Sequence, residues 1–167
     1  MGIAKHPLES CQLALLPSRV RGDGRALTLR PVQGREPFPR TDQRGDTMRN
    51  VAVVGASEKP GRYANRALRM LLSQGFSPIP ISRSGKDILG LKGYASLTDV
   101  PEPIDTVTLY LSAEKQAAII QDILAVRPRR VILNPGAENP EAEPVLAQRG
   151  IDVVEACTLV LLSTGQF

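Results

Sequence analysis

From about residue 49 to the end, short apolar runs alternate with longer segments that have helical periodicity. The run from Asn50 to Gly55 is continuous and β-branched, which is typical of a strand buried on both faces of a parallel sheet. Four further runs predict strands over 76–81, 105–111, 130–133 and 151–154. Between the runs, patterns of period 3.6 predict helices over 61–74, 113–126 and 140–149, and a last short helix over 157–163.

Several residues mark the ends or faces of these elements. Gly75 is a stop signal for the helix over 61–74. Pro78 and Pro80 lack an N–H group, so the second strand is expected at a sheet edge. Ser112 is expected to be the N-cap of the helix over 113–126, and Asn139 to cap the helix over 140–149. The predicted apolar face of the first helix consists of Ala64, Ala67, Leu68, Leu71 and Leu72.

Because strands and helices alternate, the strands are expected to run parallel, joined by right-handed crossovers. The sequence therefore predicts an α/β fold, a Rossmann-like, doubly wound and mainly parallel five-stranded sheet with helices on both faces. Such sheets bind ligands beyond the carboxyl ends of their strands. The candidate site is thus formed by residues 55–61, 82–93, 111–113 and 134–140, which follow the first four strands.

Residues 1–47 differ from the rest of the chain. They are rich in Arg, Gly and Pro and show no sustained period, which predicts a disordered N-terminal extension before a folded domain over 48–167. Five acidic residues in this segment argue against a transit peptide. A second interpretation stays open, in which the natural start is Met48 and the upstream residues come from an extended reading frame.

The charge and cysteine content narrow the classes of partner. Residues 49–167 hold 13 basic and 12 acidic groups, so this part is nearly neutral, which argues against nucleic-acid binding. Cys11, Cys157 and His6 are too few for a disulfide framework or a Cys/His metal site. No apolar run approaches the roughly 20 residues that cross a bilayer. We expect a cytoplasmic protein that binds no membrane.

The turn after the first strand has the chemistry of a phosphate site. Gly55, Ala56 and Ser57 form a small-residue turn that leads into a helix, whose N–H groups and positive end attract an anion. Lys59 and Arg62 can add charge. The turn departs from the dinucleotide fingerprint G-x-G-x-x-G, since Ser57 and Pro60 stand at the second and third glycine positions.

The end of the second strand points to a phosphorylated ribose. A nicotinamide-adenine dinucleotide site needs an acidic residue there, whereas this chain has Ser82, Arg83 and Lys86. Arg83 and Lys86 suit an extra phosphate on the ribose, which both CoA and NADP carry. A solvated surface loop would explain the same residues.

The motifs occur in an order that resembles the CoA-binding protein family, which is similar to the N-terminal CoA-binding domain of the succinyl-CoA synthetase α subunit. The match covers about residues 49–167. It consists of Val51-Ala-Val-Val-Gly-Ala-Ser57, Ile79-Pro-Ile81, Gly90, Tyr94, Pro103-Ile-Asp105, Asn134-Pro-Gly-Ala-Glu-Asn-Pro140 and Glu155-Ala-Cys-Thr158.

The resemblance implies a role for each turn. The first turn, with Gly55, Ala56, Ser57 and nearby Lys59, would carry the CoA pyrophosphate. Ser82 and Arg83 would meet the adenosine end, although many relatives have Val-Asn-Pro where this chain has Ile81-Ser82-Arg83. The cleft through which the pantetheine arm leaves would be lined by Ser112, Asn134, Pro135 and Gly136.

The predicted function is binding of CoA or an acyl-CoA without catalytic machinery of its own. The synthetase α subunit uses a phosphorylated histidine in a second domain, whereas His6 is the only histidine here. Cys157 is interpreted as a small buried residue rather than a reactive thiolate. Two alternatives stay open, a small NADP-binding oxidoreductase-like protein and an interaction or regulatory domain with a vestigial nucleotide cleft. A homodimer or a partner subunit is compatible with each.

Overall fold

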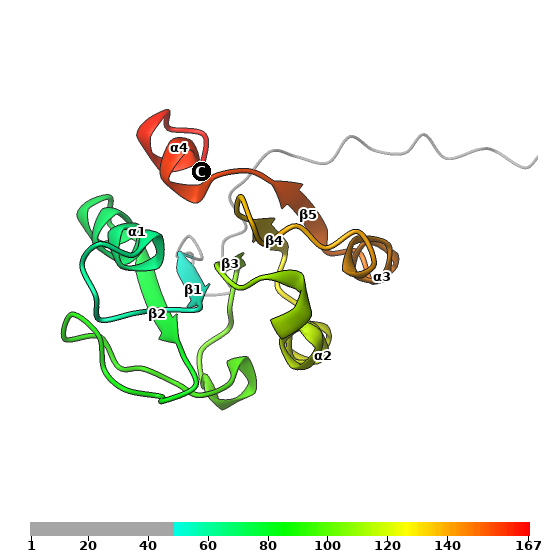
Figure 1. Cartoon of the computed structure of the whole chain (residues 1–167), viewed down its shortest axis with the longest axis horizontal. Helices are drawn as coiled ribbons and strands as arrows, with labels where there is room; N and C mark the ends of the chain where they lie inside the picture. The colour runs from blue at the N-terminus through cyan, green and yellow to red at the C-terminus, as the bar shows by residue number, and fades with distance from the viewer. Residues whose placement is uncertain (1–48) are drawn as a thin grey trace, which may run out of the picture. The chain divides into compact units, whose positions relative to one another are not determined.

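One parallel sheet organises the part of the chain that the computed structural model describes, residues 49–167; the predictions for residues 1–47 lie outside it. The strand order is β2-β1-β3-β4-β5, and every pairing is parallel (Figure 1). The predicted doubly wound α/β fold is confirmed. The strands are β1 (Asn50–Val54), β2 (Ser77–Ile81), β3 (Thr106–Leu109), β4 (Arg130–Leu133) and β5 (Asp152–Glu155).

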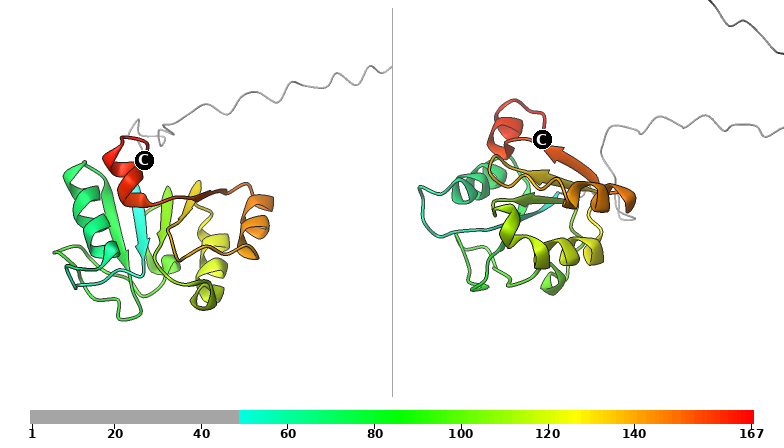
Figure 2. Two further views of the ribbon diagram at one scale, coloured as in Figure 1. Left: turned by 45° about the horizontal axis from the view of Figure 1, so that its top comes forward. Right: turned by 45° about the vertical axis from the view of Figure 1, so that its right-hand side comes forward.

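Helices cover both faces of the sheet. The α1 and α4 helices lie on one face, and α2 and α3 lie on the other (Figure 2). The helices are α1 (Tyr63–Ser73), α2 (Ala117–Val126), α3 (Ala142–Gln148) and α4 (Thr158–Ser163), with single 3₁₀ turns η1 (Leu97–Asp99) and η2 (Ala113–Lys115). Within residues 49–167, none of these helices is long and apolar enough to span a bilayer.

The central strand β1 serves two separate cores because successive side chains of a strand point to opposite faces. Val51 and Val53 pack toward α1 and α4, whereas Ala52 and Val54 pack toward α2 and α3. All four are at most 2% exposed. This burial on both faces explains why β1 reads as an unbroken apolar run rather than an alternating one.

Three predictions about the helices are wrong. The expected helix over 113–126 is divided, since η2 is followed by a separate α2, and the Ser112 side chain makes no capping hydrogen bond. Gln116 lies at the point of division, and its buried side chain bonds to the carbonyl oxygen of Leu111 before η2 and to that of Ala137 in the turn after β4. In α1, Leu72 is 41% exposed, and Asn65 lies on the buried face instead.

The prediction that β2 lies at a sheet edge is confirmed. Its neighbour on one side is β1, and on the other side Tyr94 forms only an isolated parallel bridge with Ile81. Because the Ile81 carbonyl accepts hydrogen bonds from the N–H groups of Gly55 and Ala56, at 3.0 and 3.1 Å, the end of β2 is joined to the turn after β1. The predicted cap of α3 is also present, since Asn139 Oδ1 accepts from the N–H of Ala142 at 3.1 Å.

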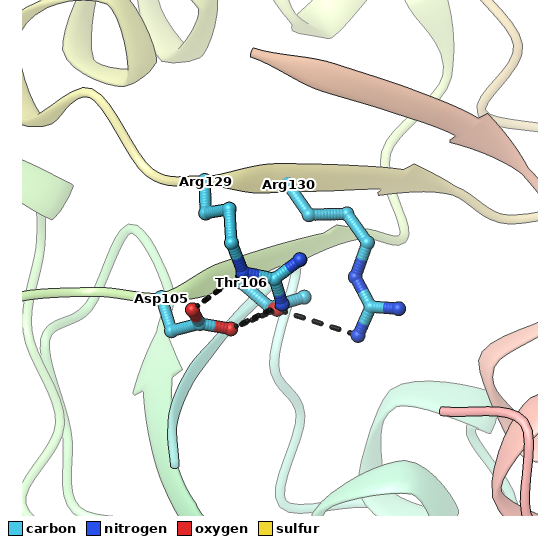
Figure 3. Close-up of polar contacts among 4 residues, drawn as sticks. All are labelled: Asp105, Thr106, Arg129 and Arg130. Atoms are coloured by element: carbon cyan, nitrogen blue, oxygen red, sulfur yellow. Dashed lines mark hydrogen bonds and ion pairs between the residues drawn. The ribbon is translucent and has the colours of Figure 1, made fainter. Parts of the chain in front are cut away.

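A polar cluster stabilises the amino edge of the sheet, opposite the candidate site. Figure 3 shows Arg129 donating two hydrogen bonds of 2.8 Å to the Asp105 carboxylate, with side chains only 13% and 11% exposed. The Thr106 hydroxyl donates to the same carboxylate. Arg130 stacks over the Phe167 ring, and burial lowers the pKa of its guanidinium. The Asp105–Arg129 pair joins the start of β3 to the start of β4, and the Arg130–Phe167 contact joins β4 to the last residue of the chain.

Candidate functional site

A cavity of about 430 Å³ lies at the carboxyl edge of the sheet, where the turns after β1, β3 and β4 meet. This is the location predicted for a ligand in a doubly wound sheet. None of its lining residues is acidic, and three are cationic. The lining consists of Gly55, Ser57, Lys59, Arg62, Tyr63, Ala64, Tyr110, Leu111, Ser112, Lys115, Pro135, Gly136 and Ala137.

The turn after β1 needs Gly55 because its φ is +85° and a Cβ atom would lie 3.2 Å from the Tyr110 carbonyl oxygen. The N–H groups of Gly55 and Ala56, expected to hold a phosphate, donate to the Ile81 carbonyl instead. Within the described residues, the N–H groups of Tyr63 and Ala64 donate no hydrogen bond. Both residues belong to the cavity lining, and free N–H groups at the start of a helix are suited to hold an anion.

Two internal hydrogen bonds hold this turn in shape. The fully buried side chain of Asn65 donates from Nδ2 to the Ser57 carbonyl oxygen at 2.8 Å. The other end of the Asn65 amide, Oδ1, accepts from Nε of Arg69 at 2.9 Å. The Ser57 hydroxyl accepts from the N–H of Lys59 at 3.2 Å. The first wall of the cavity is therefore fixed by α1 before any ligand arrives.

The wall after β3 contains Tyr110, Leu111, Ser112 and Lys115. The Tyr110 hydroxyl is buried and makes no hydrogen bond of good geometry. Burial raises the pKa of Tyr110 to about 12, although the nearby hydroxyls of Thr158 and Thr108 partly oppose this shift. Tyr110 therefore stays protonated at neutral pH and presents a neutral aromatic wall.

Gln116 joins the wall after β3 to the wall after β4. Its Nε2 donates to the carbonyl oxygens of Leu111 and Ala137, each at 2.8 Å. Its Oε1 accepts from Nδ2 of Asn139 at 3.0 Å. Since Gln116 is fully buried, these bonds are shielded from water and set the spacing of the two walls.

Asn134 belongs to a buried network rather than to the cavity lining. Its side chain is 3% exposed, and its Nδ2 donates to the Thr108 hydroxyl at 2.7 Å. Its Oδ1 accepts from the N–H of Thr158 at 2.8 Å, so it joins β4 to the start of α4. Pro135 and Gly136 do line the cavity, and the Gly136 N–H donates to the Glu138 carboxylate at 2.8 Å.

The structure brings seven of the twelve predicted site residues to the cavity. They are Gly55, Ser57, Lys59, Arg62, Ser112, Pro135 and Gly136. The other five, Ala56, Ser82, Arg83, Lys86 and Asn134, lie outside the lining. Arg83 and Lys86 are exposed on the connection after β2, and the Ser82 hydroxyl lies 3.2 Å from that of Ser84.

Four lining residues, Tyr63, Ala64, Tyr110 and Lys115, lie outside the segments predicted from the sequence, whereas Leu111 and Ala137 fall inside them without having been singled out. Tyr110 had a usable signal, because it directly follows β3 and the carboxyl ends of parallel strands meet at one edge. Lys115 had none, since its position depends on the separate turn η2. Cys157 is half-buried rather than fully buried, so the interpretation as a buried residue holds only in part. Residues 49–167 contain no group of potential metal ligands.

The profile of the CoA-binding domain family matches residues 49–163. The chain belongs to this CoA-binding domain family. The resemblance stated from the sequence motifs is therefore confirmed over the whole part of the chain that folds into the sheet. The match includes all three turns that form the cavity.

Two solved structures and one curated protein are similar to this chain over most of their own length. A crystal structure of an uncharacterized protein is 39% identical, with a TM-score of 0.68, and covers 73% of this chain and 100% of that one. A protein from Thermus thermophilus is 32% identical, with a TM-score of 0.66, over 72% of this chain and 91% of that one. Protein YneT of Bacillus subtilis is 26% identical over 106 residues, 64% of this chain and 78% of that one.

A larger enzyme contains a similar domain. The dinucleotide-forming acetyl-coenzyme A synthetase 1 of Ca. Korarchaeum cryptofilum, in complex with phosphate and ADP, is 29% identical with a TM-score of 0.57. The similarity covers 65% of this chain but only 25% of that enzyme. It therefore concerns the shared domain and not the remaining three quarters of the synthetase.

Proposed function

We propose that this chain binds CoA or an acyl-CoA in the cavity at the carboxyl edge of the sheet. The observation that carries the proposal is the lining itself: Lys59, Arg62 and Lys115 with no acidic side chain, in a member of the CoA-binding domain family. The N–H groups of Tyr63 and Ala64 add donors at the positive end of α1. Cations and unpaired N–H groups together suit the pyrophosphate of CoA.

The remaining parts of CoA would extend from this point in two directions. The pantetheine arm would follow the turns after β3 and β4, where Leu111, Pro135 and Ala137 offer apolar contacts. The adenosine end would turn toward Ser82, because β2 is joined to the turn after β1 through Ile81. Arg83 would then be the cation that binds the ribose phosphate, and Lys86 would be a second cation on the same connection.

The proposed mechanism is recognition rather than catalysis. The lining offers cations, N–H donors and neutral walls, which hold a ligand without activating it. In the Ca. Korarchaeum cryptofilum synthetase, a similar domain forms a quarter of the chain. By analogy, we propose that this chain presents bound CoA to a partner subunit or acts as a homodimeric carrier or sensor.

The test is a calorimetric titration of the full chain with CoA, acetyl-CoA, dephospho-CoA and NADPH at fixed salt. We expect micromolar binding of CoA and weaker binding of dephospho-CoA. The Arg83→Ala variant should lose affinity for CoA but little for dephospho-CoA, since a charge-assisted phosphate contact contributes about 1.5–3 kcal/mol. The Arg149→Ala variant, which removes an exposed arginine outside both the cavity lining and the connection after β2, is the matched control.

Each alternative has its own outcome in this experiment. Stronger binding of NADPH than of CoA would support the oxidoreductase-like alternative. Binding of none of the four ligands would support an interaction or regulatory domain with a vestigial cleft. If Arg83→Ala loses the same affinity for CoA and for dephospho-CoA, Arg83 does not contact the ribose phosphate. That result would not contradict the proposal that the chain binds CoA.

A further inference from the structure

Lys115 reaches the cavity from a different turn than the other two cations. Lys59 and Arg62 belong to the connection between β1 and α1, whereas Lys115 ends η2 after β3. Within the described residues, none of the three takes part in an ion pair. Three cations line one cavity from two separate turns; no acidic residue is in the lining, and the carboxylate in contact with it is that of Glu138, which accepts from the N–H of Gly136.

The backbone that carries Lys115 is held firmly in place. The next residue, Gln116, is fully buried, and its side chain is bonded on one side to Leu111 and on the other to Ala137 and Asn139. The Lys115 N–H also donates to the Ser112 carbonyl oxygen at 2.9 Å. Lys115 is exposed, but these hydrogen bonds fix its backbone, so that only its flexible side chain needs to be ordered when a ligand binds.

We propose that Lys115 is a phosphate-binding residue, which contacts the pyrophosphate of the nucleotide from the side opposite Lys59 and Arg62. The inference rests on the proposed function and deepens it. The anion would be held between two βα turns instead of on the first turn alone. The fixed position of η2 explains how an exposed lysine can contribute, because little backbone ordering is needed when the ligand binds.

The experiment compares Lys115→Gln with Arg149→Gln in the full chain. Both variants remove one exposed positive charge, but Arg149 follows α3 and lies outside the cavity lining. The ligands are CoA, ADP, which shares the pyrophosphate, and pantetheine, which has no phosphate. We expect Lys115→Gln to weaken CoA and ADP by roughly tenfold, the size of one charge-assisted contact, and to leave pantetheine unchanged. The melting temperature should stay that of the wild type.

The outcomes separate this inference from the proposed function. If wild type binds CoA and the two variants bind it equally well, the Lys115 contact is wrong and the proposed function stands. If wild type binds ADP but not CoA, and Lys115→Gln alone weakens ADP, the contact stands and the CoA assignment fails. A loss of pantetheine affinity equal to that of CoA would also overturn the inference, because it would show a general effect on the cavity.

Discussion

The buried side-chain amide of Asn65 donates a 2.8 Å hydrogen bond to the carbonyl oxygen of Ser57, eight residues earlier in the chain. This bond connects the turn after β1 to Asn65, the third residue of α1. Its partner bond from Arg69 to Asn65 Oδ1 orients the amide, so that Nδ2 faces the turn. The α1 helix therefore holds in place the turn that contributes Gly55, Ser57 and Lys59 to the cavity lining.

Replacing Asn65 by leucine should lower both stability and affinity. The variant leaves the Ser57 carbonyl without its donor, which costs about 1–3 kcal/mol in the free energy of unfolding. CoA affinity should fall as the turn loses its fixed shape. Chemical denaturation and calorimetry measure the two effects. The control is Arg69→Met, which keeps the bond to Ser57; an equal loss of CoA affinity in both variants would contradict the role assigned to the Asn65–Ser57 bond.

Replacing Asp105 by asparagine should lower stability without changing ligand affinity. Asp105 accepts two hydrogen bonds from Arg129 in a mostly buried pair, and an amide in place of the carboxylate removes the charge from this pair and one of its two acceptor oxygens. We expect a loss of about 2–4 kcal/mol in the free energy of unfolding. Because the pair lies at the amino edge of the sheet, CoA affinity of the folded fraction should equal that of wild type. Exposed Asp99→Asn is the matched control, and an Asp105 variant as stable as this control would refute the prediction.

The carboxylates of Glu143 and Glu155 predict a pH dependence. Glu143 raises the pKa of Glu155 above its ordinary value of 4.5, first through a shared hydrogen bond and then through like-charge repulsion, with a smaller contribution from Glu138. A raised pKa in the folded state means that the native protein binds the proton more tightly than the unfolded chain. The associated stability is present below pH 4.5 and is lost as the pH rises through the raised value.

The variant Glu143→Gln removes this repulsion. It should therefore melt at a higher temperature than wild type at pH 7, and the difference should shrink or reverse near pH 4.5. Thermal melts at the two pH values measure the effect. Glu102→Gln, at an exposed site elsewhere, changes the net charge equally. A melting temperature that rises by the same amount in both variants would point to net charge rather than to the Glu143–Glu155 pair.

Leu89 adopts a backbone conformation that is unfavourable for a leucine. Its φ is +57°, and with Gly90 at +76° it forms the two-residue turn between Ile88 and Leu91, which exchange two hydrogen bonds of 3.0 Å. Asparagine tolerates this conformation better, so Leu89→Asn should stabilise the fold by up to about 1 kcal/mol. Leu72→Asn is the contrasting control, because Leu72 is similarly exposed but lies in α1 and should lose helix propensity. A lower melting temperature for Leu89→Asn would show that the leucine makes a contact that outweighs the strain.

Most of the fold could be predicted from the sequence, because each strand and helix follows from the local pattern of apolar and polar residues. The β-branched run of β1 and the prolines of β2 led to the correct sheet and the correct edge strand. The division between η2 and α2 could not be predicted, because Gln116 looks like an ordinary polar residue of a helix. Only the tertiary structure shows that its amide bonds to the carbonyl oxygen of Leu111 and, across to the turn after β4, to that of Ala137.

The candidate site was only partly predictable for a similar reason. The residues directly after β1 and β4 could be placed, since strand ends are fixed by topology. Arg83 and Lys86 were chosen for their charge, but the connection after β2 carries them outside the cavity lining. The donors of the first turn were assigned to Gly55 and Ala56, whereas pairing with Ile81 occupies both N–H groups. Such pairings between distant segments leave no local signal in the sequence.

Calorimetric titration of CoA into wild type and into a Lys59→Gln/Arg62→Gln variant tests the cavity assignment most directly. We predict that wild type binds one CoA per chain and that the double variant loses affinity by more than tenfold, because two of the three cations of the cavity are removed. Unchanged affinity in the double variant would contradict the account and would place the CoA site elsewhere on the domain.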